Sequence, residues 1–288
     1  MAIFKPIKHA DKDCTIESLP HSRIQAFFDI LRYQWRKMVA CSLILFACAI
    51  PLIVVFYIEI KGIAYFAGQF SQELIDKDTY LSSVFSTLNY SNLFLILAFA
   101  LFGLGIGVVH RIYVKLCWQK GILFQSELNE GLKKNSLQDV IVSMIFAALL
   151  FLAGLVYGIS LITESHLTIL VIIFYVVVMA IFLPIMFIFF QMNAVYKDSF
   201  MRKLKNSFLI FGRTFPFAIL WLIIFLAPFA LLFLGTDLAI LITLGCYFLI
   251  YFPLGFLALN LFLLKIFDKY INARFYPEIV DLGIWRKL

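Results

Sequence analysis

Six long blocks of apolar residues limit the fold of this chain more than any other feature. A helix needs roughly 20 mostly apolar residues to cross the hydrocarbon core of a bilayer, which is about 30 Å thick. Hydrophobic residues make up 63% of the chain and charged residues only 14%, an excess that one water-soluble core cannot bury. The sequence therefore predicts an all-α membrane protein with six transmembrane helices. These are expected at Val39–Ile58, Asn92–Val109, Gln138–Ile162, Leu167–Phe190, Phe215–Leu234 and Leu238–Leu264.

Lysine and arginine residues are distributed unevenly among the segments that lie between these blocks. Of the 24 basic residues, all but Lys61 and Lys77 lie before the first block, between the second and third, between the fourth and fifth, or after the sixth. Cytoplasmic segments of membrane proteins collect Lys and Arg. We therefore expect a multi-pass protein of the cell membrane with both termini in the cytoplasm. The net charge of +7 has the same explanation, so nucleic acid is not an expected partner.

The connections on the outer side differ in length. Thr163–His166 and Gly235–Asp237 are so short that spans three and four, and spans five and six, must form antiparallel hairpins. The outer loop 59–91 is long enough to hold a short surface helix or a partner-docking segment. The prediction is thus a cytoplasmic N-terminal extension (1–22), a single transmembrane domain of three hairpins (23–275) and a cytoplasmic tail (276–288).

A basic amphipathic stretch precedes each hairpin, and each is predicted to form a cytoplasmic helix. Helices of this type lie at the membrane interface, with the apolar face among acyl chains and the cations near anionic head groups. Membrane anchoring and docking of a cytoplasmic partner are both open roles. The apolar residues are Ile24, Phe27, Phe28, Leu31 and Trp35 in the first stretch, Phe124, Leu128 and Leu132 in the second, and Phe200, Met201, Leu204 and Phe208 in the third; a fourth such helix, Ile266 to Phe275, follows the last span.

The cores of the six spans contain no ionisable residue. Proton relays need such groups within the membrane, and intramembrane proteases and metal enzymes need clustered acids, His or Cys. The chain is therefore predicted not to be an enzyme and to hold no metal or cofactor. An amide in lipid seeks an interhelical hydrogen bond, and contact with a substrate is its alternative role. The candidates for polar contacts within the membrane are Asn260, Thr243, Gln191 and Asn193.

Histidines, glycines and prolines add smaller expectations. His110, at the inner end of the second span, and His166, in an outer turn, are predicted to be interfacial residues. Gly103/Gly107 and Gly154/Gly158 have the Gly-x-x-x-Gly spacing that lets helices approach closely. We predict packing within the chain, with a dimer interface as the alternative. Four prolines within spans are predicted to kink them because each removes a backbone donor: Pro51, Pro184, Pro228 and Pro253.

Two segments carry a resemblance to a known family. They are FQSELNEGLKKNSLQDVIVSMIFAALLFLAGL (124–155) and YKDSFMRKLKNSFLIFGRTFPFAILWLIIFLAPFALL (196–232), the latter followed after the sixth span by LLKIFDKYINARF. A basic helix with a central Lys-Asn that runs through a Pro-bearing junction into a Leu/Phe-rich span resembles the YesL-like family of bacterial integral membrane proteins. The resemblance covers roughly residues 25 to 270. The N-terminal extension and the first outer loop make this chain look longer than a typical member.

Members of that family are commonly encoded beside carbohydrate ABC importers and are thought to assist them. The resemblance therefore implies a non-enzymatic accessory protein, with importer permease subunits or the ATPase as partners on the cytoplasmic face. It supplies no catalytic or binding residues. A stand-alone transporter of a neutral solute or lipid is the alternative. An importer permease is disfavoured because Glu127–Gly131 does not fit the Glu-Ala-Ala…Gly pattern that docks the ATPase.

Overall fold

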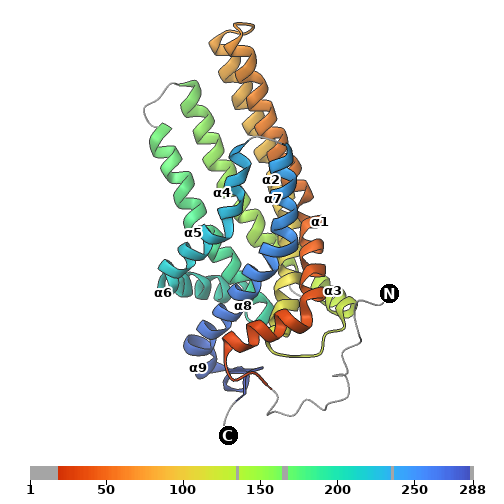
Figure 1. The fold of residues 1–288 in the computed structure, drawn as a ribbon. Coiled ribbons are helices and arrows are strands. Elements are labelled where there is room, and N and C mark those ends of the chain that lie inside the picture. Colours follow the sequence, from red (N-terminus) through yellow and green to blue (C-terminus); the bar gives the residue numbers. More distant parts are fainter. Residues whose placement is uncertain (1–18, 134–135, 164–167, 235–236, 286–288) are drawn as a thin grey trace, which may run out of the picture.

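The computed structural model describes residues 19–133, 136–163, 168–234 and 237–285, which are mostly helical and contain no strand (Figure 1). Six helical segments are long and apolar enough to cross a membrane, as expected of an all-α, multi-pass membrane protein. The helices are α1 (Arg23–Ser71), α2 (Lys77–Cys117), α3 (Phe124–Lys133), α4 (Ser136–Ile162), α5 (Thr168–Val195), α6 (Phe200–Leu226), α7 (Asp237–Cys246), α8 (Phe252–Phe267) and α9 (Ala273–Phe275), with 3₁₀ segments at Ala227–Leu234 and Pro277–Ile279 and π-helical segments at Tyr247–Tyr251 and Asp268–Asn272.

The segment 59–91, predicted as an outer loop, is almost entirely helical. It consists of the end of α1 and the start of α2, which are joined by a short turn at residues 72–76. Figure 1 shows these two helices rising side by side beyond the other helices at one end of the molecule. We call this the far end. The apolar blocks predict only the part of each helix that crosses a bilayer, and both α1 and α2 continue beyond that part.

Contacts between the two helices explain this continuation. A Cβ atom added to Gly62 would lie 2.9 Å from a side-chain carbon of Thr87, so the glycine permits close approach. Nearer the turn, the rings of Phe70 and Tyr80 stack with centroids 5.0 Å apart. The Asp76 carboxylate accepts the backbone N–H of the third residue of α2 at 2.9 Å and caps that helix. Each helix thus stabilises the other where apolar residues become sparse.

The predicted amphipathic stretches take different forms. The first is the beginning of α1, the second is the separate helix α3, the third is the beginning of α6, and the fourth spans the end of α8 to α9. In Figure 1 the beginning of α1 lies across one end of the bundle before the helix turns along it. In this part Ala26 and Ile30 are buried, whereas Ile24 and Phe28 are 73% and 60% exposed.

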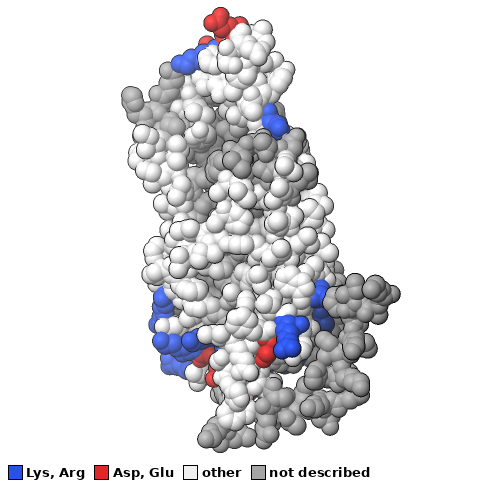
Figure 2. Space-filling model, in the orientation of Figure 1, with Lys and Arg blue, Asp and Glu red and all other residues white. Residues whose placement is uncertain are grey.

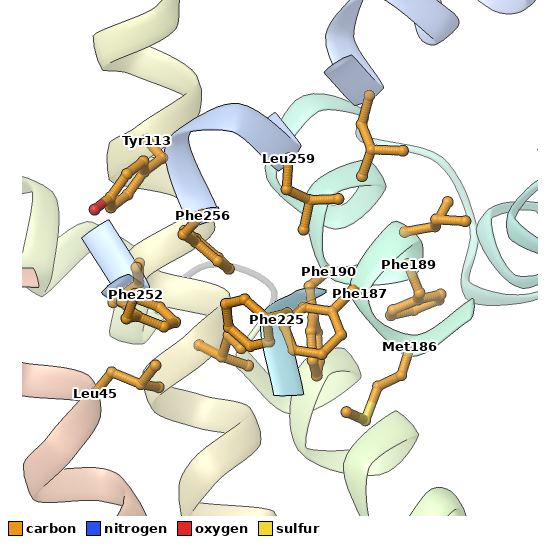
Figure 3. Close-up of a cluster of buried hydrophobic side chains, with 14 of the residues drawn as sticks. Leu45, Tyr113, Met186, Phe187, Phe189, Phe190, Phe225, Phe252, Phe256 and Leu259 are labelled. Atoms are coloured by element: carbon orange, nitrogen blue, oxygen red, sulfur yellow. The ribbon is translucent and has the colours of Figure 1, made fainter. Parts of the chain in front are cut away.

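Helix α2 lies at the centre of the bundle. It packs against α1, α3, α4, α5 and α8, and most residues from 103 to 117 are buried. Beside it, aromatic rings from several helices form a continuous core (Figure 3). Phe187 lies 6.4 Å from Phe190 and 6.1 Å from Phe225, and Phe252 stacks on Phe256 at 4.7 Å, measured between ring centroids. Offset and edge-to-face ring pairs stabilise such a core beyond the area they bury.

The four motif glycines lie where α2 meets α4. A Cβ atom at Gly103 or Gly107 would lie 1.9 or 2.1 Å from a side-chain oxygen of α4. In return, a Cβ atom at Gly154 or Gly158 would lie 2.7 or 2.6 Å from a side chain of α2. Such distances are far shorter than van der Waals contact. Both Gly-x-x-x-Gly spacings therefore serve packing within the chain, as predicted.

The prolines act differently from one another. Pro51 and Pro184 lie inside α1 and α5, which continue through them. Pro228 lies in the 3₁₀ segment that follows α6, and Pro253 comes two residues after a π-helical segment. A proline removes one backbone donor and crowds the preceding turn, which favours such local changes of helix type. The two short outer connections lie mostly outside the described residues, and His166 is among those not described.

Charged residues gather at the two ends of the molecule, and the middle of the visible surface is uncharged (Figure 2). The end opposite the far end holds α3, the C-terminal turns of α2, the beginning of α6, and α9 (Figure 1). We call it the basic end, because most of the described Lys and Arg residues belong to these segments and to the beginning of α1.

Residues from the two ends of the described chain meet at the basic end, in contacts that we call the terminal clasp. Arg23 forms an ion pair with Asp268, and its Nη2 lies 3.7 Å from Asp281 Oδ1. The backbone N–H of Trp285 donates a hydrogen bond to the Pro20 carbonyl at 2.9 Å. The beginning of α1 is thereby attached to the segment that follows α8.

Candidate functional site at the basic end

A cleft of about 440 Å³ opens at the basic end, between the C-terminal turns of α2 and the connection from α5 to α6. Its walls combine cations, amides, an acid and aromatic rings. The residues with polar or aromatic side chains are Arg111, Lys115 and Trp118 of α2, Gln138 of α4, Asn193 of α5, and Tyr196, Lys197 and Asp198 of the connection. A concave site with a few convergent polar groups is the usual form of a binding site.

On one wall, the cations of α2 are paired with acids of α3. Arg111 Nη2 lies 2.5 Å from Glu130 Oε2, and Lys115 forms an ion pair with Glu127, which is 8% exposed. These charge-assisted contacts fix α3 against α2. On the opposite wall, Lys197 is exposed and forms no ion pair with any described residue. The positive charge that the cleft offers to a partner is therefore concentrated at Lys197.

A buried polar triad adjoins the floor of the cleft: Asp139 of α4, Asn193 of α5 and Lys203 of α6. Asn193 donates through Nδ2 to Asp139 Oδ1 at 2.8 Å and accepts through Oδ1 from Lys203 Nζ at 2.5 Å. Lys203 also donates to Gln138 Oε1 at 3.0 Å. The three residues are 5%, 2% and 1% exposed, respectively. The triad therefore joins three helices through one carboxylate, one amide and one ammonium group.

The triad balances its own charge. A buried carboxylate or ammonium is strongly unfavourable alone, and here each is matched by the other through the bridging amide. Asn193 and Gln138 also line the cleft. The floor consequently presents hydrogen-bonded amide groups rather than unpaired charge.

A second network connects the cleft to the terminal clasp. The Tyr196 hydroxyl donates to Asn272 Oδ1 at 2.6 Å, and Asn272 Nδ2 donates to Asp268 Oδ1 at 2.7 Å. Asp268 is in turn the partner of Arg23. Burial, together with the nearby Asp268 carboxylate, raises the pKa of Tyr196 well above its usual value, so this phenol stays protonated and remains a donor. This network thus attaches the α5–α6 connection, which forms one wall of the cleft, to the terminal clasp.

The four residues predicted to make polar contacts within the membrane lie in different parts of the structure. Asn193 belongs to the triad, whereas Gln191 and Asn260 meet deeper in the bundle. Gln191 Nε2 donates to the Asn260 carbonyl at 2.9 Å, and Asn260 Nδ2 donates to the Phe256 carbonyl of its own helix at 2.8 Å. Thr243 is 1% exposed and its hydroxyl has no hydrogen-bond partner among the described residues. Asn260 and Gln191 are therefore contacts between helices in this structure.

His110 lies in the interior, contrary to the interfacial position predicted for it. It is completely buried, its ring centroid is 4.3 Å from that of Phe256, and its Nδ1 lies 3.2 Å from Asn260 Oδ1. The apolar block ends beside His110, but α2 continues to Cys117 and remains covered by neighbouring helices. The end of an apolar block is therefore not the end of the buried part of the helix.

Two members of the triad were not among the candidates from sequence. Asp139 is the second residue of the third predicted span, and its place at the edge of the block hid its burial. Lys203 lies between Met201 and Leu204 in the third predicted amphipathic stretch, where cations are expected near head groups. A signal for its burial does exist: Lys203, Ser207, Ile210 and Thr214 recur at helical spacing, and all four are buried.

Groups that could bind a metal are not assembled in the described part of the chain, where no three His, Cys, Asp or Glu residues cluster. The described cysteines Cys41, Cys48, Cys117 and Cys246 are free thiols. The cleft also contains no acid, base and nucleophile in mutual contact among the described residues. What its geometry offers is binding through amides, an exposed ammonium and aromatic rings.

Taken together, the fold and this cleft define a polytopic α-helical protein, and the face shown in Figure 2 is uncharged in the middle and charged at both ends. No protein-family model, no curated protein and no solved structure matches the chain.

Proposed function

We propose that this protein is a non-enzymatic integral membrane accessory protein that assists a carbohydrate uptake system of the ABC importer type. The carbohydrate system is suggested by the resemblance to the YesL-like family. The observation that carries a docking role is the cleft at the basic end, with the exposed Lys197 on one wall and amides on its floor. The partners would be permease subunits or the ATPase of the importer.

The proposal includes an orientation in the cell membrane. The basic end lies in the cytoplasm, and the spans form three hairpins, each preceded by an amphipathic helix at the inner surface. Two observations support it: the gathering of Lys and Arg at one end, and the exposed Ile24 and Phe28 on the part of α1 that lies across that end. Both termini would then be cytoplasmic.

Cysteine labelling tests this orientation. In a background without the native cysteines, Lys133→Cys and Lys205→Cys are expected to react with a membrane-impermeant maleimide only after the cells are opened. Lys77→Cys, beside the far turn, is expected to react in intact cells. All three positions are exposed, whereas Lys203 is buried and would report nothing. Labelling of Lys133→Cys and Lys205→Cys from opposite faces would refute the arrangement.

A partner that docks in the cleft is expected to lose affinity when the charge of its rim is reversed. Lys197→Glu should reduce co-purification of importer subunits in mild detergent by about tenfold, because an attractive charge at the interface becomes repulsive. Lys205→Glu makes the same charge change at an exposed position of α6 that does not line the cleft. It should leave capture unchanged. Equal capture by both variants would contradict docking at this cleft.

The second candidate function is a stand-alone transporter of a neutral solute or lipid. It is favoured by an apolar pocket of about 390 Å³ between α6 and α8, lined by Trp221, Phe225, Tyr251 and Gly255 among others. The 3₁₀ and π-helical segments at 227–234 and 247–251 lie near this pocket in the chain, and non-α segments of this kind often occur at functional sites. A monomer that moves solute in proteoliposomes would favour this function over the accessory role.

A further inference from the structure

A further pocket lies toward the far end, between the α1–α2 pair and the α4–α5 pair. Its volume is about 300 Å³, and all four helices contribute to its walls. Most of the wall is apolar, with Ile63, Leu88 and Val171 among the lining residues. Ile172 and Val176 also line it and are 49% and 59% exposed on the surface of α5. Because α5 is one of the helices apolar enough to cross a membrane, the pocket opens sideways toward lipid.

One acid lies in this apolar pocket. Glu59 of α1 lines it, and its Oε2 accepts a hydrogen bond from Ser91 Oγ at 3.2 Å. No Lys or Arg of the described residues forms an ion pair with Glu59. The nearest lysine in sequence, Lys61, lies over the ring of Tyr57 instead, with Nζ 5.6 Å from the centroid. A carboxylate among apolar side chains is strongly stabilised by a positive charge, which the chain itself does not supply.

The other polar groups of the pocket point to the same kind of ligand. Asn92 uses its Nδ2 to donate to the Leu88 carbonyl at 2.7 Å, which leaves its Oδ1 as an acceptor. The phenols of Tyr157 and Tyr175 line the pocket as well and can accept hydrogen bonds. A carboxylate, an amide oxygen and phenol oxygens together favour a ligand that is both cationic and rich in donors, as an ammonium group is.

The expected position of Glu59 relative to the bilayer suits the head group of an amphiphile. Glu59 directly follows the apolar block Val39–Ile58, so it lies near the boundary between hydrocarbon and head groups. A water-soluble amine would gain little from the apolar walls. A volume of about 300 Å³ is at the lower limit for small-molecule sites, enough for a head group and its first methylene groups. The rest of a chain would lie along the exposed side chains of α5.

We propose that this pocket binds the primary ammonium head of a membrane lipid, with Glu59 as the counter-charge and the acyl chain beside Ile172 and Val176. The ligand is thus an amphiphile of the ethanolamine class. The inference is independent of the docking role of the cleft, because the two sites lie toward opposite ends of the molecule and share no lining residue. Failure of one proposal leaves the other intact.

Photolabelling tests the site. The full-length protein in detergent micelles is illuminated with decylamine that carries a diazirine on its chain, and labelled peptides are mapped by mass spectrometry. Labelling is expected to concentrate on the segment of α5 around Val171–Val176. An ethanolamine phospholipid should displace the label, and a glycerol phospholipid should not. The alcohol with the same chain should label the apolar surface at background level, because it lacks the positive charge.

Two variants locate the interaction. Glu59→Gln removes the charge at nearly constant shape and should reduce labelling by the amine about tenfold or more, in line with the loss of a charge-assisted hydrogen bond. Glu73→Gln removes the same charge from an exposed position of the far turn and should change nothing. Val176→Trp starts from a lipid-exposed position and should block the pocket without disturbing the core. Equal labelling by amine and alcohol, or equal labelling of the Glu59 and Glu73 variants, would overturn the proposal.

Discussion

Replacing Lys203 with methionine is expected to lower the free energy of unfolding by about 3–5 kcal/mol. Methionine keeps the apolar stem but removes the ammonium group. Asn193 Oδ1 and Gln138 Oε1 then lose their donor, and the buried Asp139 carboxylate loses the positive charge that balances it. For a chain of this size the midpoint of thermal unfolding should fall by roughly 10 °C.

The native thiols provide the measurement. Cys41 and Cys117 are completely buried and should react with a fluorogenic maleimide only when the bundle opens. The matched control is Lys205→Met, which changes an exposed lysine of the same helix in the same way. If both variants release their buried thiols at the same temperature, the triad does not hold these helices together.

A second substitution separates charge balance from packing. Asp139→Asn alone is expected to destabilise, because it leaves the ammonium of Lys203 without its buried counter-charge. Combined with Lys203→Met, it should do less harm than the sum of the two single changes, since neither charge then remains unpaired. Additive effects would indicate that the two residues act independently.

Adding side chains at the α2–α4 contact is the second change with a large expected effect. The Cβ atom of Gly103→Ala would lie 1.9 Å from Ser143 Oγ and 2.9 Å from the Asp139 carbonyl oxygen, and backbone cannot move aside as a flexible side chain can. Overpacking of this kind destabilises by roughly 1–3 kcal/mol. Gly107→Val, which adds three carbon atoms against the Asp139 carboxylate, is expected to prevent accumulation of folded protein.

Gly212 supplies the control for these substitutions. It lies on an exposed face of α6, and a Cβ atom there would meet nothing within 4 Å. Gly212→Ala should therefore raise the stability slightly, by up to about 1 kcal/mol, because alanine favours a helix. The measurement is the yield of monodisperse protein in size-exclusion chromatography together with the unfolding midpoint. Gly103→Ala and Gly212→Ala shifting the midpoint in the same direction would contradict the close contact.

Much of the fold could be predicted from the apolar blocks, because a bilayer sets a minimum length for each span. The helical continuation through 59–91 could not, since it depends on contacts such as Gly62 with Thr87 and Phe70 with Tyr80, which a hydropathy pattern does not contain. The same pattern placed His110 at a boundary. Its burial results from helices that cover α2 beyond the apolar block.

The candidate site was only partly accessible from sequence. Asn193 is predicted as a polar contact because an amide near the inner end of the fourth span should seek an interhelical hydrogen bond. Asp139 lies at the edge of its apolar block and Lys203 lies in a basic amphipathic stretch, and in both places a charged residue usually faces water or head groups. Only the crossing of α4, α5 and α6 places both residues in the interior. Such pairing between residues of different helices depends on three-dimensional packing, which a single sequence does not reveal.

The terminal clasp has a consequence for the order in which the bundle assembles. Its ion pair between Arg23 and Asp268 closes a loop of 245 residues, and the entropy lost on closure grows with loop length. Local pairs such as α1 with α2 across their five-residue turn carry almost no such penalty. The first turns of α1, which carry Arg23, should consequently dock last, after the other helices have packed together. A partly assembled bundle would then expose its basic end, while its aromatic interior is already covered.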